Sequence, residues 1–214
     1  MSTTGVLLLA AGKSTRFGGD KLLTPITING IRLPIIAHTL NAYQSLNLPI
    51  KVLSHSLHTK LHEFLQDYKI PYLICPHAHL GMGHSLSCAV RNNQNWEGWL
   101  VGLADMPYIK PSTLKTIMDN SHEDKIVRPT YHHEGEAVTP LDLTAKEISK
   151  DNILGHPVFF PFRFAYGLSR LRGDVGARDL IKHHWHEQKL IKVDDPGILI
   201  DIDRPTDIID MKSE

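Results

Sequence analysis

An apolar run near the start of the chain opens directly into a glycine-rich, basic loop, and this junction limits the fold more than any other stretch. Residues 5–10 read Gly-Val-Leu-Leu-Leu-Ala, and residues 11–21 hold three glycines and three cationic side chains. A short apolar run of this kind is typical of a strand buried on both faces of a mostly parallel sheet. The loop then lies at the carboxyl end of the strand, where open α/β sheets bind ligands. The sequence therefore predicts an anion-binding loop here, the alternative being a solvated surface turn.

Helical and strand patterns alternate along most of the chain. Helices are predicted at 34–46, 57–68, 81–90, 111–120 and 177–182, with a possible short one at 144–150, and strands at 50–54, 72–75, 99–103 and 125–129. A last strand is predicted to begin at 197 and to enter a terminal helix near 207. Alternating strands and helices imply right-handed crossovers and a parallel sheet. We therefore expect a three-layer α/β/α, Rossmann-like fold.

Composition narrows the class of partner. The 214 residues include 23 basic and 23 acidic side chains, so a broad face for nucleic acid or anionic lipid is not expected. No linker or low-complexity tract divides the chain, which favours one domain over 1–214. Two cysteines are too few for a disulfide framework and fit a reducing cytoplasm. The first apolar run is too short for a membrane span and lacks the flanks of a signal peptide, so we expect a cytoplasmic protein with a small-molecule substrate and no membrane contact.

Two common phosphate-binding motifs are not met. A P-loop needs a glycine five positions before Gly12, and Leu7 is there. A dinucleotide fingerprint needs a third glycine after Gly81-Met82-Gly83, and Leu86 stands in its place. An NAD-dependent oxidoreductase is therefore the least favoured class.

Aspartates near the ends of two predicted strands are candidate metal ligands. Asp105 follows the strand at 99–103, and Asp201 and Asp203 alternate onto one side of the last predicted strand. A carboxylate at the end of a buried strand is costly unless it is exposed or paired with a cation. Mg²⁺ is usually held by one or two carboxylates plus substrate phosphates. We expect Asp105 to bind Mg²⁺ with Asp203, preferred over Asp201, although Asp105 could instead form a turn before Pro107.

Three further stretches have chemistry that fits phosphate or substrate contacts. Gly81 and Gly83 permit close backbone approach and Ser85 can donate a hydrogen bond, or the stretch caps a helix. Asp174 and Arg178 lie in a glycine-containing loop and in the first turn of the helix that follows it. They either bind a phosphate group or have structural roles, as a helix cap and a surface ion pair. His156 lies between a glycine and a proline, which fixes its direction. It either contacts a substrate or caps a turn.

The first loop resembles the opening signature of the MobA-like nucleotidyltransferases, L-A-A-G-x-S-x-R-x-G-x-x-K. The matched positions are Leu9, Ala10, Ala11, Gly12, Ser14, Arg16, Gly18 and Lys21. Later stretches resemble further motifs of the family: G-M-G-x-S-L, D-M-P, G-H-P-V-x-F, G-D-x-G-A-R and a terminal D-I-D, where Arg204 and Thr206 depart from the common letters. Together they point to the molybdenum cofactor cytidylyltransferase branch, which joins CMP from CTP to molybdopterin-bound molybdenum and releases pyrophosphate.

The resemblance also implies roles for single residues. It implies catalytic roles for Arg16, Lys21 and Asp105, nucleotide contacts for Leu9, Ala10, Ala11, Gly12, Lys13, Ser14, Gly18, Gly81, Gly83 and Ser85, acceptor contacts for His156, Asp174 and Arg178, and Mg²⁺ on Asp105 and Asp203. Ala11 replaces a glycine of the sister guanylyltransferases, which favours cytosine. The implied partner is a molybdoenzyme of the xanthine oxidase type.

One departure from the family pattern leaves the identity of the second substrate, the acceptor, open. The G-H-P-V-x-F motif comes later than the family pattern predicts, which indicates an insertion at about 134–153. Transfer from GTP or to another phosphate acceptor therefore remains an alternative. A non-catalytic carrier of finished cofactor is a second alternative, of a different class.

Overall fold

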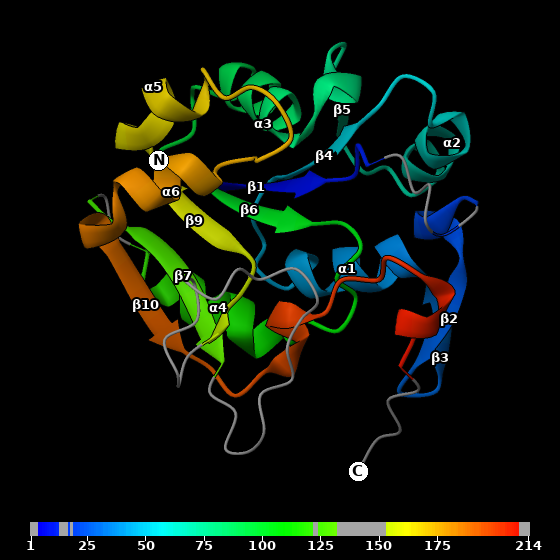
Figure 1. Cartoon of the computed structure of the whole chain (residues 1–214). Coiled ribbons are helices and arrows are strands. Elements are labelled where there is room, and N and C mark those ends of the chain that lie inside the picture. Colours follow the sequence, from blue (N-terminus) through cyan, green and yellow to red (C-terminus); the bar gives the residue numbers. More distant parts are fainter. Residues whose placement is uncertain (1–3, 13–16, 18, 122–123, 132–152, 210–214) are drawn as a thin grey trace.

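The computed structural model describes residues 4–12, 17, 19–121, 124–131 and 153–209 (Figure 1). Lys13, Ser14, Arg16 and Gly18 of the first loop lie outside the described residues. The same is true of the possible helix at 144–150 and of nearly all of the proposed insertion.

The centre of the molecule is a mostly parallel sheet with the strand order β10-β7-β9-β6-β1-β4-β5 and with β8 paired to β7. Its strands are β1 Thr4–Leu9, β4 Ile50–Ser54, β5 Tyr72–Ile74, β6 Gly98–Leu103, β7 Ile126–Tyr131, β8 Ile153–Leu154, β9 Val158–Pro161 and β10 Gln188–Lys192. Strand β1 lies between β4 and β6 and is parallel to both, as the sequence predicts. Strand β9 is antiparallel to β6 and β7.

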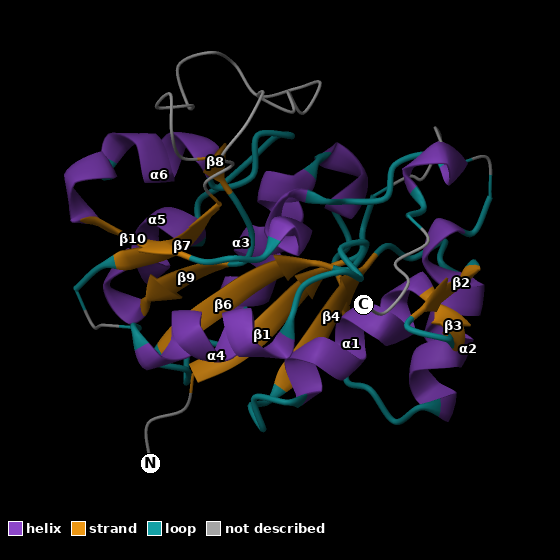
Figure 2. Cartoon of the chain, turned by 90° about the horizontal axis from the view of Figure 1, so that it is seen from below, coloured by secondary structure: helices purple, strands orange, loops and turns teal. Residues whose placement is uncertain are grey.

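Helices cover both faces of this sheet, which gives the three layers that the sequence predicts. They are α1 Ile35–Gln44, α2 Thr59–Asp67, α3 Met82–Arg91, α4 Pro111–Asp119, α5 Ala165–Leu168 and α6 Arg178–His183. Figure 2 shows α1 and α4 on one side of the sheet and α3, α5 and α6 on the other. In the described part of the chain, no helix is both long and apolar enough to cross a membrane.

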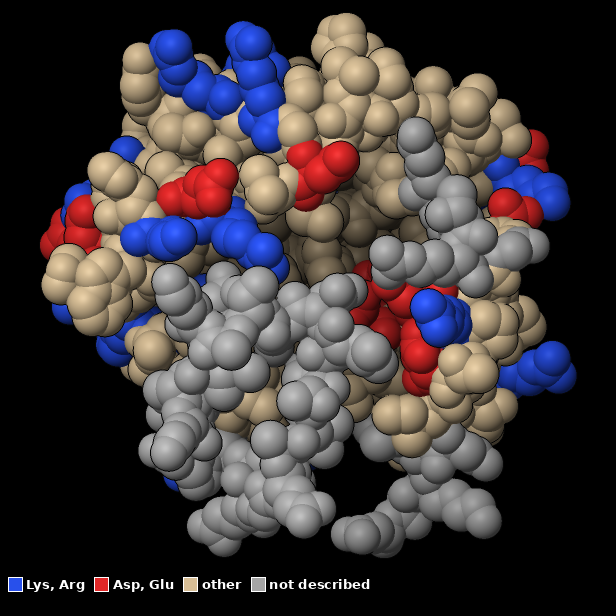
Figure 3. Space-filling model, viewed as in Figure 1, with Lys and Arg blue, Asp and Glu red and all other residues tan. Residues whose placement is uncertain are grey.

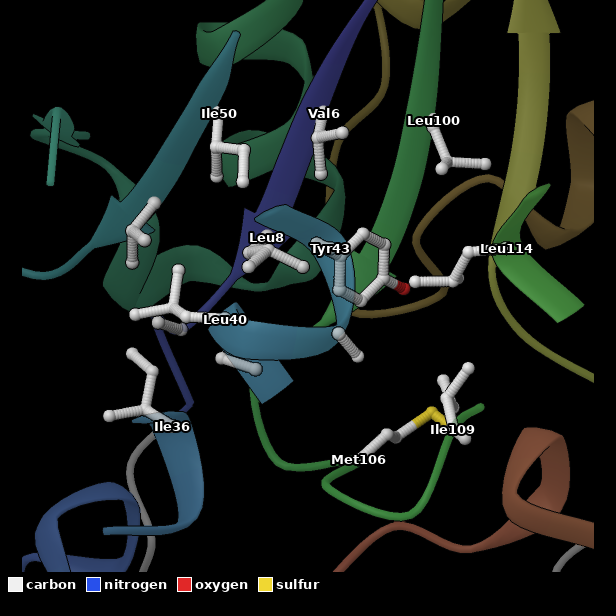
Figure 4. Packing of buried hydrophobic residues seen from close by; sticks show 14 of the residues in the cluster. Val6, Leu8, Ile36, Leu40, Tyr43, Ile50, Leu100, Met106, Ile109 and Leu114 are labelled. Carbon is white, nitrogen blue, oxygen red and sulfur yellow. The ribbon is translucent and has the colours of Figure 1, made fainter. Parts of the chain in front are cut away.

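Alternate side chains of β1 enter two separate hydrophobic cores. Val6 and Leu8 pack with the residues of α1 and α4, and Leu7 packs with α3 on the other face. This double burial explains why the apolar run of β1 is continuous rather than alternating. In Figure 4, Tyr43 of α1 lies between Leu8 and Leu114 of the first core. Gly102 of β6 leaves room for this ring, because a Cβ there would come within 2.1 Å of the Tyr43 hydroxyl oxygen.

A β-hairpin between the first loop and α1 is absent from the sequence-based expectations. Strands β2 Pro25–Ile28 and β3 Ile31–Pro34 pair antiparallel. Asn29 and Gly30 between them have φ angles of 51° and 77°. Two positive φ angles are what a two-residue hairpin turn needs, and Asn-Gly supplies them at low steric cost.

The prediction of a strand and a helix at the C-terminal end is wrong. The chain there forms two short 3-10 helices, η5 Pro196–Leu199 and η6 Pro205–Asp207, joined by an irregular segment. The Ile202 N–H donates to the Asp105 carbonyl oxygen at 3.0 Å, so the segment is bound to the loop after β6 instead of to a neighbouring strand. Its apolar residues are typical of a strand, but here they pack in a small hydrophobic cluster, in which Ile202 has no exposed surface and packs with Ile26, Ile35 and Tyr108.

Candidate active site

A pocket with a volume of about 570 Å³ opens at the carboxyl ends of β1 and β6. It is lined by Leu9, Ala11, Gly12, Lys21, Ala78, His79, Gly81, Met82, Ser85, Leu103, Asp105, Asp174, Asp201 and Asp203. Figure 3 shows the hollow near the middle of one face of the molecule, with acidic side chains gathered on its rim. The pocket thus lies where parallel sheets bind ligands, and it brings together most of the described candidate residues.

Lys21 is the central cation of this pocket. It begins the 3-10 helix η1 Lys21–Leu23, and only 7% of the residue is exposed. Its Nζ lies 2.6 Å from Oδ2 of Asp105 and 3.3 Å from Oδ1 of Asp203. Burial alone lowers the pKa of Lys21, but the charges of Asp105 and Asp203 and their hydrogen bonds outweigh it and raise the pKa above its ordinary value. The side chain is therefore an ammonium ion at neutral pH.

Three aspartates form an acidic group around this ammonium ion. Carboxylate oxygens of Asp105, Asp201 and Asp203 all lie within 4.8 Å of one another. In the described part of the chain, this is the one group of three or more His, Cys, Asp or Glu side chains with such spacing. Burial, followed by the charges of Asp105 and Asp203, raises the pKa of Asp201, although this side chain reaches the surface at the pocket mouth. Carboxylate oxygens at this spacing suit a hard divalent cation, so the group could hold one.

The opposite wall of the pocket is built by the N-terminus of α3 and the segment 172–174. The Gly83 N–H donates to the Gly173 carbonyl oxygen at 2.8 Å. Gly81 has a φ of 120°, and a Cβ there would lie 2.2 Å from Oδ1 of Asp174. In the structure Gly81 and Gly83 admit the backbone of the other segment, and Gly81 also lines the pocket, whereas Gly83 is not among the lining residues. Asp174 is brought to the pocket by this packing.

Ser85 offers a free hydroxyl to the pocket. The residue is 1% exposed, and its Oγ has no hydrogen-bond partner among the described residues. A buried hydroxyl without a partner is costly, and few occur in folded proteins. The hydroxyl is therefore available to a bound ligand.

Other candidate residues do not line the pocket. Ala10 is 4% exposed and packs in the core with α1. His156 precedes β9, and its N–H donates to the Ile198 carbonyl oxygen at 2.9 Å. Burial, and then the charge of Arg128, lowers the pKa of His156 to about 4, so its ring is neutral. Arg178 begins α6 and is exposed.

Four pocket residues are absent from the sequence-based candidates: Ala78, His79, Met82 and Leu103. Ala78 and His79 belong to the 3-10 helix η2 Ala78–Leu80, which follows β5. A position shortly after a predicted strand would have been sufficient reason to consider them.

A three-layer, mostly parallel fold with a lysine and several aspartates in a pocket at the carboxyl edge of its sheet is typical of the α/β proteins that bind small-molecule ligands at this edge. Residues 6–189 match the model of the MobA-like NTP transferase domain. The chain belongs to this family, whose substrates are nucleotides.

Known proteins similar to this chain include one curated relative and several solved structures. The purine catabolism protein PucB of Bacillus subtilis is 26% identical over 209 residues, covering 93% of this chain and 91% of PucB. The crystal structure of Rv0371c from Mycobacterium tuberculosis has a TM-score of 0.75 at 22% identity and covers 96% of this chain and 95% of its own, and a further structure of Rv0371c contains manganese. Mth528, a nucleotidyl transferase from Methanothermobacter thermautotroptrophicus, has a TM-score of 0.75 at 17% identity and covers 97% of this chain and 94% of its own. At these identities the solved structures support the fold.

Proposed function

We propose that this protein transfers CMP from CTP to the phosphate of a molybdopterin-type molybdenum cofactor, in a reaction that depends on Mg²⁺. A phosphate oxygen of the acceptor attacks the α-phosphorus of CTP, and the bond between the α- and β-phosphates breaks. Pyrophosphate leaves with the bonding electron pair, and no group is oxidised or reduced. The observation that supports the proposal most is the close approach of Lys21 to Asp105 and Asp203 in a pocket beside Gly12.

Binding and charge neutralisation are the main demands of this reaction. Phosphoryl-type transfer needs in-line positioning of the two substrates and stabilisation of charge on the leaving group. In the proposal Gly12, Gly18 and Ser14 cradle the phosphates, and Lys13, Arg16 and Lys21 offset their charge. Asp105 and Asp203 hold Mg²⁺, which supplies Lewis-acid stabilisation to phosphate oxygens when it is bound. No general base is required, because an acceptor phosphate is already ionised at neutral pH.

The nucleoside half of CTP is proposed to bind beside the small residues of the pocket. Ala11 and Gly12 line it with little bulk, which leaves room for a flat base and a ribose. The hydroxyl of Ser85 is available to donate to the nucleotide. Ala11, where the guanylyltransferase branch has glycine, favours CTP over GTP.

The acceptor is proposed to enter past Asp174. This residue lines the same pocket as Lys21. In the proposal it therefore lies beside both CTP and the acceptor. His156 and Arg178 are proposed to contact a more distant part of the acceptor. A molybdoenzyme of the xanthine oxidase type is the proposed recipient of the product, and the name of PucB, a purine catabolism protein, is in keeping with it.

One experiment separates the proposal from its alternatives. The purified protein is incubated with Mg²⁺, molybdenum cofactor and each of the four ribonucleoside triphosphates, and pyrophosphate release is followed together with cofactor binding. Release with CTP and the cofactor, lost in Asp105→Asn, is the expected result. Release with GTP instead, or with a different phosphate acceptor only, would redirect the proposal to that substrate. Tight cofactor binding with no pyrophosphate under any condition would indicate a carrier.

A further inference from the structure

The ammonium group of Lys21 lies inside the acidic group that suits a divalent cation. Its Nζ is 2.6 Å from an oxygen of Asp105 and 3.3 Å from an oxygen of Asp203. These two residues and Asp201 bring carboxylate oxygens within 4.8 Å of one another. A divalent cation held by Asp105 and Asp203 would draw on the same two carboxylates, since carboxylate oxygens are the ligands that hard cations prefer. The ammonium ion and the metal therefore compete for these carboxylates.

We propose that Lys21 acts as a tethered cation that blocks the divalent-metal site until a polyphosphate draws its ammonium group away. The inference rests on the proposed function, since it takes the polyphosphate to be that of the nucleotide. Besides its proposed catalytic role, Lys21 then couples the two ligands: metal binding would release the ammonium ion to the phosphates, and the phosphates would leave the carboxylates to the metal. Nucleotide and metal then bind together much more tightly than either binds alone.

The charges in the pocket favour this exchange. Among the described residues, one ammonium ion faces the negative charge of three carboxylates. A divalent cation neutralises more of it than an ammonium ion does. Removing Lys21 from Asp105 without a substitute would, however, leave a buried cation unpaired, which is strongly unfavourable. A bound polyphosphate would pair with the Lys21 ammonium group in place of Asp105. Metal binding and polyphosphate binding would then each favour the other, which is a coupling between two sites.

The surroundings of Lys21 give the side chain room to move. Its stem is long and flexible, with the charge at the tip. The residue borders the main pocket of about 570 Å³ and also a smaller cavity of about 200 Å³ beside Asp20 and Lys60. Both cavities adjoin η1, a 3-10 helix of only three residues. The ammonium group can therefore leave Asp105 while the fold around it stays in place.

Mn²⁺ binding in the absence of nucleotide tests this inference directly. Free Mn²⁺ is counted by electron paramagnetic resonance during titration of the wild type, Lys21→Met and Lys60→Met. Lys60 is the matched control, because it pairs with Asp20 at 2.8 Å on the surface and its loss removes the same charge outside the acidic group. We expect Lys21→Met to bind Mn²⁺ about tenfold more tightly or better, a typical coupling between sites, and Lys60→Met to match the wild type. If Lys21→Met does not fold, Lys21→Gln takes its place, since it keeps a hydrogen-bond donor without the charge.

A second titration adds a non-hydrolysable CTP analogue, corrected for its own affinity for Mn²⁺. The analogue should tighten Mn²⁺ binding to the wild type more than to Lys21→Met. Equal or weaker Mn²⁺ binding by Lys21→Met without nucleotide would overturn the inference, even if the wild type transfers CMP. Tighter Mn²⁺ binding by Lys21→Met in a protein that shows no turnover with any triphosphate would leave the inference standing and refute the proposed reaction.

Discussion

Lys21 and Asp105 are 84 residues apart in the chain, yet their side chains form an ion pair with 2.6 Å between Nζ and Oδ2. The pair joins the segment after β1 to the segment after β6, two adjacent parallel strands. It is largely shielded from solvent, with 8% of the Lys21 side chain and 19% of the Asp105 side chain exposed. The proposed catalysis depends on both members of this pair.

Asp105→Ala should reduce Mg²⁺-dependent pyrophosphate release by roughly 100-fold or more, the loss typical of one transition-state contact. The reason is that the metal loses its most buried carboxylate ligand. Asp119→Ala is the control, because Asp119 pairs with Lys115 on the exposed surface of α4. Steady-state kinetics over a range of Mg²⁺ concentrations gives the comparison. Activity near the wild-type level in Asp105→Ala would remove the proposed metal role of this residue.

Lys21→Ala should lower kcat by roughly 100-fold or more and raise KM for CTP by a smaller factor, because charge on the leaving pyrophosphate grows in the transition state. Arg16→Ala is expected to behave in the same way. Both are measured with CTP varied at saturating acceptor. An effect confined to KM in either variant would assign that residue to ground-state binding.

Ser85→Ala should weaken nucleotide binding by about tenfold, since a hydrogen bond to a charged group is typically worth about 1.5–3 kcal/mol. It should keep or raise the thermal midpoint, because the buried hydroxyl that it removes has no partner within the described protein. Ser87→Ala is the matched control: the Ser87 Oγ donates to the Ser169 carbonyl oxygen at 2.6 Å and Ser87 does not line the pocket. That variant should lose about 1 kcal/mol of stability and keep its nucleotide affinity. The reverse pattern would show that Ser85 is a structural residue.

Ala11→Gly should shift the ratio of kcat/KM for CTP over GTP toward GTP by about tenfold, the effect of one methyl group in a binding pocket. Ala78→Gly removes the same group from another part of the pocket lining and should leave the ratio unchanged. Competition between the two labelled triphosphates measures both variants. An unchanged ratio in Ala11→Gly would place base discrimination elsewhere.

His156 should make the protein less stable below neutral pH. Its pKa is lowered to about 4 in the folded state, mainly by burial, whereas an unfolded histidine has a pKa of about 6.5. Between these values the unfolded state binds more protons, so the free energy of unfolding falls as the pH falls from about 6.5 toward 4. Urea unfolding at pH 7 and pH 5 should show a loss that is roughly 1–2 kcal/mol smaller in His156→Gln. Equal losses in both proteins would mean that the His156 ring is readily protonated in the folded state.

The residues of a short stretch were sufficient to predict those elements whose limits are marked by their own neighbours in the sequence. Strand β4 has the predicted bounds, 50–54, because its apolar residues form a short stretch between Pro49 and His55. The carboxyl-edge rule for parallel sheets was sufficient to expect Lys21 near Asp105. Both inferences need only the strand pattern and the topology it implies.

Tertiary contacts decide the parts that the sequence did not predict. The segment that carries Asp201 and Asp203 has no regular structure, and the hydrogen bond from Ile202 N–H to the Asp105 carbonyl oxygen positions it. The antiparallel strand β9 is inserted between β6 and β7, and nothing in its own residues indicates that place. The strict need for glycine at position 81 comes from its φ of 120° and from the backbone of Gly173, whose oxygen would lie 2.4 Å from a Cβ there and which is far away in the chain.

The contact of Gly81 and Gly83 with residues 172–174 limits how relatives of this protein can vary. The two segments touch backbone to backbone, so a larger residue on one side has space only if the other side retreats. Substitutions at 81, 83 and 172–174 should therefore appear together among homologues. A change in segment 172–174 that suits a different acceptor would then also shift segment 81–83 beside the proposed nucleotide site. The specificity for the acceptor and the specificity for the nucleotide would therefore evolve together.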